Sequence, residues 1–134
     1  MPKIDHQQLL SFCKQLLFSG GMAKDDADLV ADLLVKGELR GYAGHGVIRV
    51  NPYLNWIKDG TYQINDKPAI ERDGKITAVV DGKHYIGQVA AHFAMALAIK
   101  KGKPHTVDAA TARGKNPKNA PKKATSSPPT DADK

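Results

Sequence analysis

The residues best suited to chemistry lie between Glu38 and Tyr53, in the stretch ELRGYAGHGVIRVNPY. His45 stands between two glycines, Arg49 follows four residues later, and Tyr53 follows four residues after that. An imidazole can give or take a proton near neutral pH, and a guanidinium can hold both oxygens of a carboxylate. The pattern therefore indicates a site for a 2-oxo acid, in which Arg49 binds the carboxylate and His45 supplies a proton.

The spacing also predicts how these side chains are placed. In a helix, a step of four residues puts His45 and Arg49 on one face with their Cβ atoms about 5–6 Å apart, and Tyr53 extends the same face. Each residue has a structural alternative. His45 can be a loop histidine that caps a helix, Arg49 can form a salt bridge with Glu38 or Asp59, and Tyr53 can pack in the core. Spacing alone does not decide between these roles.

An amphipathic helix is expected over residues 4–18. Its apolar side chains recur at steps of three and four, Asp5 is suited to cap the first turn, and Gly20-Gly21 can end the helix. Cys13 lies on the apolar stripe and is the only cysteine, so it cannot form an internal disulfide. We expect it to be a small core side chain.

A second helix is expected to begin at Asp25 or Asp26, whose carboxylates suit the positive end of a helix dipole. It should end at residues 38–40, before Gly41, which is free to take the backbone conformation that ends a helix.

A third helix is expected to follow His45 and to end at Asp59-Gly60. Pro52 falls inside this apolar pattern. Either Asn51 caps a restarted helix with Pro52 in its first turn, or the helix is kinked at the proline.

The pattern then changes from helical to mixed. Residues 69–71 and 75–80 read as strands bounded by Asp-Gly turns, and residues 87–100 read as a strong helix. Strand, turn and helix in this order are the opening of an α/β unit. We therefore expect a helical region over residues 1–66 and the start of a second domain over residues 67–100.

The composition changes again after residue 100. Residues 101–134 hold five of the eight prolines, one large aliphatic side chain and no aromatic, so we expect this segment to be disordered. It also holds eight of the twenty basic residues and three of the fourteen acidic ones. The net charge of +6 therefore belongs mostly to the tail, and the preceding residues are nearly neutral.

Several partner classes are disfavoured by these observations. No stretch approaches the roughly 20 apolar residues that span a membrane, and no signal peptide is seen, so we expect a cytoplasmic protein. His6, His84 and His92 have no metal-ligand spacing with one another, so no metal is expected. A basic tail can bind nucleic acid through phosphates, but it lacks aromatics for base stacking, and nucleic acid is the less favoured partner.

Several ordered motifs resemble the type-2 malate/L-lactate dehydrogenase family, which includes ureidoglycolate and sulfolactate dehydrogenases. The first motifs are Gly21-Met22, an Ala-rich second helix, and Arg40-Gly41. Next come Gly44-His45-Gly46, Arg49 and Tyr53, and then the Val80-Asp81-Gly82 turn and Gly87-Gln88 ahead of an Ala-rich helix. The matches keep their order over about the first hundred residues.

The resemblance implies an enzyme that transfers hydride between NAD(P)H and a small 2-oxo or 2-hydroxy acid on a fold without the Rossmann motif. It implies a homodimer in the complete enzyme, with the site in a cleft between domains. By resemblance His45 is the proton donor, Arg49 is a contact to the substrate carboxylate, and Tyr53 lies on the same face. Gly44 stands where the family usually has serine, so a hydroxyl that could bind substrate or cofactor is missing.

The family pattern is not found after Lys101, where a further strand and the cofactor-binding loops are expected. We therefore expect an N-terminal fragment of such an oxidoreductase, produced by a frame shift or another truncation and inactive alone. The alternative is a small helical interaction module without catalysis, carrying a basic disordered tail. The sequence does not identify the substrate or decide between NADH and NADPH.

Overall fold

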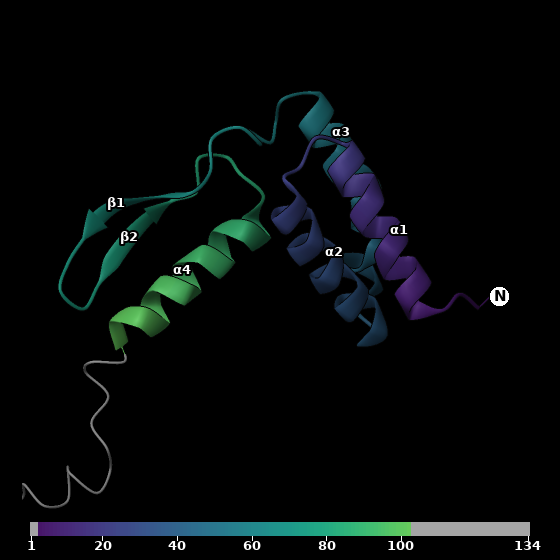
Figure 1. The fold of residues 1–134 in the computed structure, drawn as a ribbon, viewed down its shortest axis with the longest axis horizontal. Helices are drawn as coiled ribbons and strands as arrows, with labels where there is room; N and C mark the ends of the chain where they lie inside the picture. Colours follow the sequence, from purple (N-terminus) through teal and green to yellow (C-terminus); the bar gives the residue numbers. More distant parts are fainter. Residues whose placement is uncertain (1–2, 103–134) are drawn as a thin grey trace, which may run out of the picture. The chain divides into compact units, whose positions relative to one another are not determined.

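The computed structural model describes residues 3–102, which all belong to one compact unit spanning residues 1–104. Along the chain come α1 (His6–Ser19), α2 (Lys24–Leu39), the short 3-10 helices η1 (Ala43–His45) and η2 (Val47–Arg49), α3 (Val50–Lys58), β1 (Ala69–Asp73), β2 (Ala78–Asp81) and α4 (Gly87–Gly102). Helices come first and a strand pair with a closing helix follows, which confirms the predicted mixed α and β class (Figure 1).

The expected disorder of the tail falls on residues that lie outside the described part, apart from Lys101 and Gly102, which belong to α4. The division of residues 1–100 into two domains at residue 66 stays a prediction.

The first helix begins and ends where its sequence signals predict. One carboxylate oxygen of Asp5 accepts hydrogen bonds from the backbone N–H groups of Gln7 and Gln8, at 2.9 and 3.1 Å. These bonds satisfy two of the donors that a helix start leaves unpaired. The helix ends at Gly20, and Gly21 has φ +101°, a left-handed value that favours glycine.

The second helix packs beside the first (Figure 1). It begins at Lys24 and places both predicted acidic residues, Asp25 and Asp26, in its first turn, near the positive end of the helix dipole. It ends at Leu39, and Gly41 has φ +82°, so the predicted break is confirmed.

The core lies mainly between α1 and α2 and extends to the segment before α4. Cys13 is 1 % exposed, as predicted, and its burial raises the pKa of the thiol. The largest fully buried side chains are Leu17, Met22, Val30, Leu34 and Ile86. Ile86 comes from the far end of the described sequence, so this core ties α4 to the helical region.

The predicted third helix is wrong in its first part. Residues 47–49 form η2, with the Arg49 N–H donating to the Gly46 carbonyl at 3.0 Å, and the α-helix begins only at Val50. A proline inside an α-helix lacks an N–H and crowds the carbonyl four residues earlier. Starting at Val50 puts Pro52 in the first turn, where neither penalty applies. Of the two expected outcomes, the restarted helix is therefore correct, although Asn51 is not its cap.

The two strands form an antiparallel hairpin. Ala69 pairs with Asp81 and Asp73 pairs with Ala78, with a bulge between Ile70 and Arg72. The predicted strand at 75–80 was placed too early, because the turn extends to Thr77, whose carbonyl accepts from the Gly74 N–H at 2.8 Å. The hairpin packs against α4, and β2 is the strand that makes this contact.

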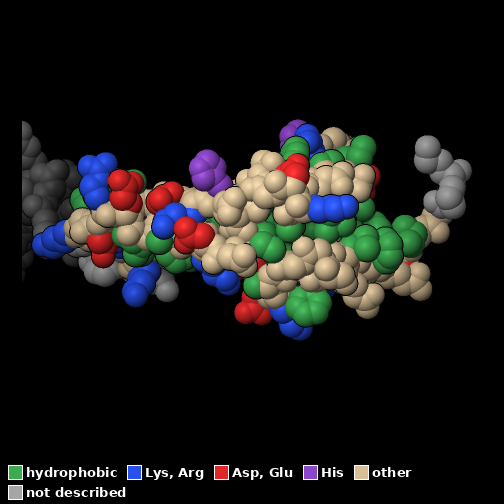
Figure 2. Space-filling model, turned by 90° about the horizontal axis from the view of Figure 1, so that it is seen from above, with side chains coloured by type: hydrophobic (Ala, Val, Ile, Leu, Met, Phe, Trp, Pro, Cys, Tyr) green, Lys and Arg blue, Asp and Glu red, His purple; other side chains and the backbone are tan. Residues whose placement is uncertain are grey.

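Much apolar surface stays exposed on the described residues. Every residue of β1 is exposed, and α4 buries only Val89 although its sequence is strongly apolar. On α4, Met95 and Ile99 are 62 % and 54 % exposed. Figure 2 shows hydrophobic side chains reaching the surface on the face that it presents. Between residues 3 and 102 no helix is both long enough and apolar enough to cross a bilayer.

Candidate functional site

The loop that carries His45 is held against the C-terminal end of α2. The Tyr42 N–H donates to the Gly37 carbonyl at 2.9 Å, and the His45 N–H donates to the Tyr42 carbonyl at 2.8 Å. A Cβ on Gly37 would lie 3.1 Å from the His45 carbonyl oxygen. This close approach of two backbones therefore depends on a glycine in the helix.

Glu38 fixes the other side of the loop. Its carboxylate accepts a hydrogen bond from the Val47 N–H at 3.2 Å. A Cβ on Gly46 would overlap that carboxylate and lie 3.2 Å from the Glu38 Cα atom. Gly46 therefore lets the chain pass close to α2, and Glu38 sets where η2 begins.

His45 ends η1 and is exposed. Among residues 3–102 its ring has no hydrogen-bond partner and caps no helix, so the capping alternative is wrong. The ring is also not enclosed by apolar side chains. Both ring nitrogens are therefore available for hydrogen bonds to a bound molecule.

His45 and Arg49 do not lie on one α-helical face, as the spacing had suggested. His45 belongs to η1 and Arg49 to η2, and between them Gly46 has a non-helical backbone with φ −94° and ψ −146°. A step of four places two side chains together only along continuous helix. The predicted geometry is therefore wrong, although both residues sit in adjoining turns of one loop.

Arg49 reaches back over this loop. Its Nε donates to the Gly44 carbonyl at 2.8 Å. The ion pairs of residues 3–102 include none between Arg49 and Glu38 or Asp59, so that alternative is wrong. Asp59 instead accepts from the Thr61 N–H at 2.9 Å. Because Nε has only one of the five guanidinium protons, the two terminal nitrogens of Arg49 keep four donors for a carboxylate.

Gly44 contributes through its backbone. Its carbonyl anchors Arg49, and a Cβ at this position would meet no atom within 4 Å. The loop therefore has room for the serine that the resemblance leads one to expect here.

Tyr53 is 9 % exposed and packs among aromatic rings, as its structural alternative requires, and its predicted contact to substrate stays a prediction. Its ring centroid lies 5.8 Å from that of Trp56 and 5.7 Å from that of Tyr62. Burial raises the pKa of Tyr62, Tyr53 raises it further, and the positive charge of Arg49 lowers it. The charge of Arg49 therefore influences the pKa of a tyrosine in the aromatic cluster of Tyr53, Trp56 and Tyr62.

Two side-chain hydrogen bonds join this helical region to the C-terminal part of the described chain, one within α4 and one just before it. Gln88 Nε2 donates to the Tyr53 hydroxyl at 2.7 Å. The Tyr85 hydroxyl donates to the buried Asp26 carboxylate at 2.6 Å, and Lys67 lies 3.2 Å from the same carboxylate. Burial, and then Asp26, raises the pKa of Tyr85 strongly.

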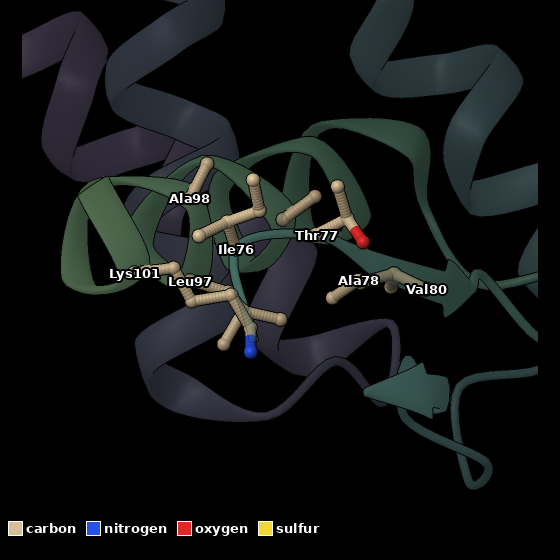
Figure 3. Close-up of a pocket in the computed structure, with 8 residues that line it drawn as sticks. Ile76, Thr77, Ala78, Val80, Leu97, Ala98 and Lys101 are labelled. Atoms are coloured by element: carbon tan, nitrogen blue, oxygen red, sulfur yellow. The ribbon is translucent and has the colours of Figure 1, made fainter. Parts of the chain in front are cut away.

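A groove of about 380 Å³ lies between β2 and α4 (Figure 3). Ile76, Val80 and Leu97 line it, and the Lys101 amine at its end is bound to Asp73 and to the Gly74 carbonyl. A nucleotide phosphate needs free donors, and this groove offers apolar side chains and an occupied amine. This groove therefore lacks the free donors that a nucleotide phosphate needs.

Metal binding likewise finds no support in the described part of the chain, where no three His, Cys, Asp or Glu side chains come together.

The sequence does not reveal which residues support the candidate site through contacts with neighbouring elements. Glu38 was considered only as an ion-pair partner, and its position at the end of a helix facing a glycine was the available signal. Gln88 was noted as part of the resemblance but given no role. Asp26 was assigned to a helix end, and nothing in the sequence pointed to Tyr85 as its partner.

Comparison with known proteins gives the family. Residues 4–117 match the family described as malate/L-lactate dehydrogenase. The chain is 36 % identical over 114 residues to a malate dehydrogenase of Pyrococcus horikoshii and 39 % identical over 98 residues to an L-sulfolactate dehydrogenase of Methanocaldococcus jannaschii. These matches cover 85 % and 72 % of this chain. The chain belongs to the malate/L-lactate dehydrogenase family.

Solved structures agree with this assignment. The malate dehydrogenase of Pyrococcus horikoshii matches with a TM-score of 0.74 at 37 % identity, over 77 % of this chain and 30 % of that one. The sulfolactate dehydrogenase of Methanocaldococcus jannaschii matches with a TM-score of 0.71 at 32 % identity, over 75 % and 29 %. The chain spans 32 % and 28 % of the length of the two curated relatives above.

Proposed function

We propose that this chain carries the proton-transfer and carboxylate-binding residues of a nicotinamide-dependent dehydrogenase for small 2-oxo and 2-hydroxy acids. The observation that carries the proposal is the loop from Gly44 to Arg49. It carries an exposed imidazole without a partner among the described residues and, in the adjoining short turn, a guanidinium fixed through Nε. The named relatives are dehydrogenases of malate and sulfolactate, which are both small 2-hydroxy acids.

In this proposal the substrate carboxylate binds the terminal nitrogens of Arg49. His45 gives a proton to the 2-oxo oxygen as the carbonyl carbon is reduced, and takes it back in the reverse direction. A bound reduced nicotinamide would supply the hydride, and we place its site on residues other than those described. The hydroxyl of Tyr53 contributes a further hydrogen bond to the substrate.

We further propose that the chain alone has little or no activity. The support is that His45 is exposed to solvent and that the groove between β2 and α4 lacks free donors for a nucleotide phosphate. A water-filled site weakens the electrostatic contacts that catalysis needs. The purified chain should therefore not oxidise NADH or NADPH with pyruvate or oxaloacetate, and such turnover would contradict this part.

Complementation tests the role of His45. The full chain is mixed with the segment of the Pyrococcus horikoshii malate dehydrogenase that lies beyond the match, supplied as a separate polypeptide. NADH oxidation by oxaloacetate should require both parts. His45→Ala should lower it by about 10²–10⁴-fold, the usual contribution of a general acid. His6→Ala changes another exposed histidine and should leave the rate unaltered. A restored rate that survives His45→Ala would refute the assignment.

The exposed apolar side chains of α4 and the hairpin support a second candidate, a non-catalytic interaction module. They also support the homodimer expected of a complete enzyme. The two candidates differ in one measurement on the purified chain. Saturable quenching of protein fluorescence by pyruvate favours a catalytic remnant, and a change in oligomeric state without such quenching favours the module. A cytoplasmic location is proposed from the single buried cysteine.

A further inference from the structure

Gln88 and Tyr53 connect two elements that lie 35 residues apart in sequence. Gln88 is the second residue of α4, and Tyr53 lies in the middle of α3. The side-chain amide donates from Nε2 to the phenol oxygen at 2.7 Å. Packing against Trp56 and Tyr62 restricts the Tyr53 ring, so the amide fixes the one remaining freedom, the direction of the hydroxyl proton.

A phenol oxygen can accept a hydrogen bond and donate its own proton at the same time. Because the Gln88 amide already donates to this oxygen, the Tyr53 proton must point elsewhere. In the hydrogen bond that joins Tyr53 to Gln88, the phenol oxygen takes part only as the acceptor. The Tyr53 hydroxyl can therefore donate its proton to an acceptor on a bound molecule.

The helical backbone places this donor near Arg49. Arg49 and Val50 have helical backbone angles, with φ of −77° and −58°, so Arg49 and Tyr53 are one turn apart on a continuous face. Tyr62, which contacts Tyr53, also feels the charge of Arg49. An anion held by Arg49 is thus within reach of the same cluster.

We propose that Gln88 is a positioning residue that orients the Tyr53 hydroxyl as a donor to an oxygen of the bound 2-oxo acid. This inference rests on the proposed function, because it needs an acid bound at Arg49. Under this proposal, the start of α4 takes part in substrate binding together with the loop from Gly44 to Arg49.

Two substitutions separate the direction of this hydrogen bond from its presence. Gln88→Glu keeps the shape, but the introduced carboxylate can only accept, so the Tyr53 proton must turn toward it. Gln88→Met removes the bond without adding charge. A glutamate in the first turn also suits the helix dipole, so Gln88→Glu should not weaken α4. Gln15→Glu makes the same charge change at an exposed position on α1.

The measurement is NMR of the full chain with ¹³C-labelled tyrosine, in which Tyr53→Phe assigns the Tyr53 Cζ signal. Wild type and Gln88→Glu should move this signal to opposite sides of its position in Gln88→Met. Pyruvate should then shift the signal in wild type, bind about fivefold more weakly to Gln88→Met, as expected for one lost hydrogen bond, and leave the Tyr53 signal unmoved in Gln88→Glu. Gln15→Glu should behave as wild type.

Two results would overturn the inference. One is a Tyr53 Cζ signal that is the same in all three chains. The other is pyruvate binding with equal affinity and an equal Tyr53 shift in wild type and Gln88→Met. If the free chains follow the expected order but pyruvate perturbs neither Arg49 nor Tyr53 in wild type, the error lies in the proposed site, and the positioning role falls with it.

Discussion

At the scale of single residues, the site depends on how Arg49 divides its donors. The bond from Nε to the Gly44 carbonyl uses the side of the guanidinium and leaves its end free. An arginine held in this way loses little side-chain freedom when a carboxylate arrives, because its direction is already set. A lysine at this position has only one nitrogen and cannot both anchor and bind in the same geometry.

Gly46 is the residue whose substitution should disturb this loop most directly. In Gly46→Ala the new Cβ overlaps the Glu38 carboxylate, which must move and give up the Val47 N–H. The expected loss is about 1–2 kcal/mol in the free energy of unfolding, measured by urea denaturation followed by circular dichroism.

Gly44→Ala is the matched control, because a Cβ at that position has no neighbour within 4 Å. It should stay within about 0.5 kcal/mol of wild type. Equal losses in both variants would show that Glu38 does not hold the loop.

At the scale of elements, the Tyr85–Asp26 hydrogen bond joins the segment before α4 to the start of α2. Tyr85 is 4 % exposed and Asp26 is 8 % exposed. In Tyr85→Phe the carboxylate loses its 2.6 Å donor and keeps only the exposed Lys67. A hydrogen bond to a charged group contributes about 1.5–3 kcal/mol, and urea denaturation should show a loss in this range. Tyr62→Phe, whose hydroxyl has no partner among the described residues, should lose less than about 0.5 kcal/mol.

The same pair predicts a dependence on alkaline pH. The pKa of Tyr85 is raised in the fold above its ordinary value of 10.0, so the folded chain holds the phenol proton more tightly than the unfolded chain. This stabilisation is present in full below pH 10 and is lost as the pH rises above it. The difference in unfolding free energy between wild type and Tyr85→Phe should therefore shrink above pH 10. A constant difference from pH 8 to pH 11 would argue against the assignment.

The sequence predicted the elements whose signals are local. Asp5 and Gly21 mark the ends of α1 because capping bonds and left-handed turns involve only neighbouring residues. It could not predict that Val47–Arg49 take 3-10 geometry, because Pro52 and the contact between Gly46 and Glu38 act together. The hairpin pairing and the bond from Gln88 to Tyr53 join residues far apart in sequence, and no periodicity carries that information.

The sequence singles out the residue types of the candidate site, whose role stays a prediction, but it does not give their geometry. His45 and Arg49 were singled out because few side chains move protons or bind carboxylates, and that argument needs no structure. Their placement in two separate short turns depends on α2, against which the loop is built. A spacing rule that assumes a continuous helix takes no account of contacts between the loop and another helix.

At the scale of the whole molecule, one question is whether the chain folds on its own despite its exposed apolar surface. Cys13 reports on this, since it is 1 % exposed in the core between α1 and α2 and its pKa is raised. If the core is stable by about 3 kcal/mol or more, its reaction with a thiol reagent at pH 8 should be slowed by at least roughly a hundredfold relative to the chain in urea.

The control is Ser11→Cys in a Cys13→Ala chain, which places a thiol at an exposed position on the same helix. It should react at the rate of a free cysteine with or without urea. Fast reaction of Cys13 without denaturant would mean that the isolated chain does not form this core.

The central claim is that the loop holding His45 and Arg49 binds a small 2-oxo acid, and titration of the full chain with pyruvate tests it most directly. NMR should follow the Arg49 Nε and His45 ring signals, with Arg49→Lys as the test variant and Arg72→Lys, on the exposed strand β1, as the control. We predict saturable shifts of both signals in wild type and Arg72→Lys, and binding weakened about tenfold or more in Arg49→Lys. Unchanged signals in wild type, or equal affinity in Arg49→Lys, would contradict the claim.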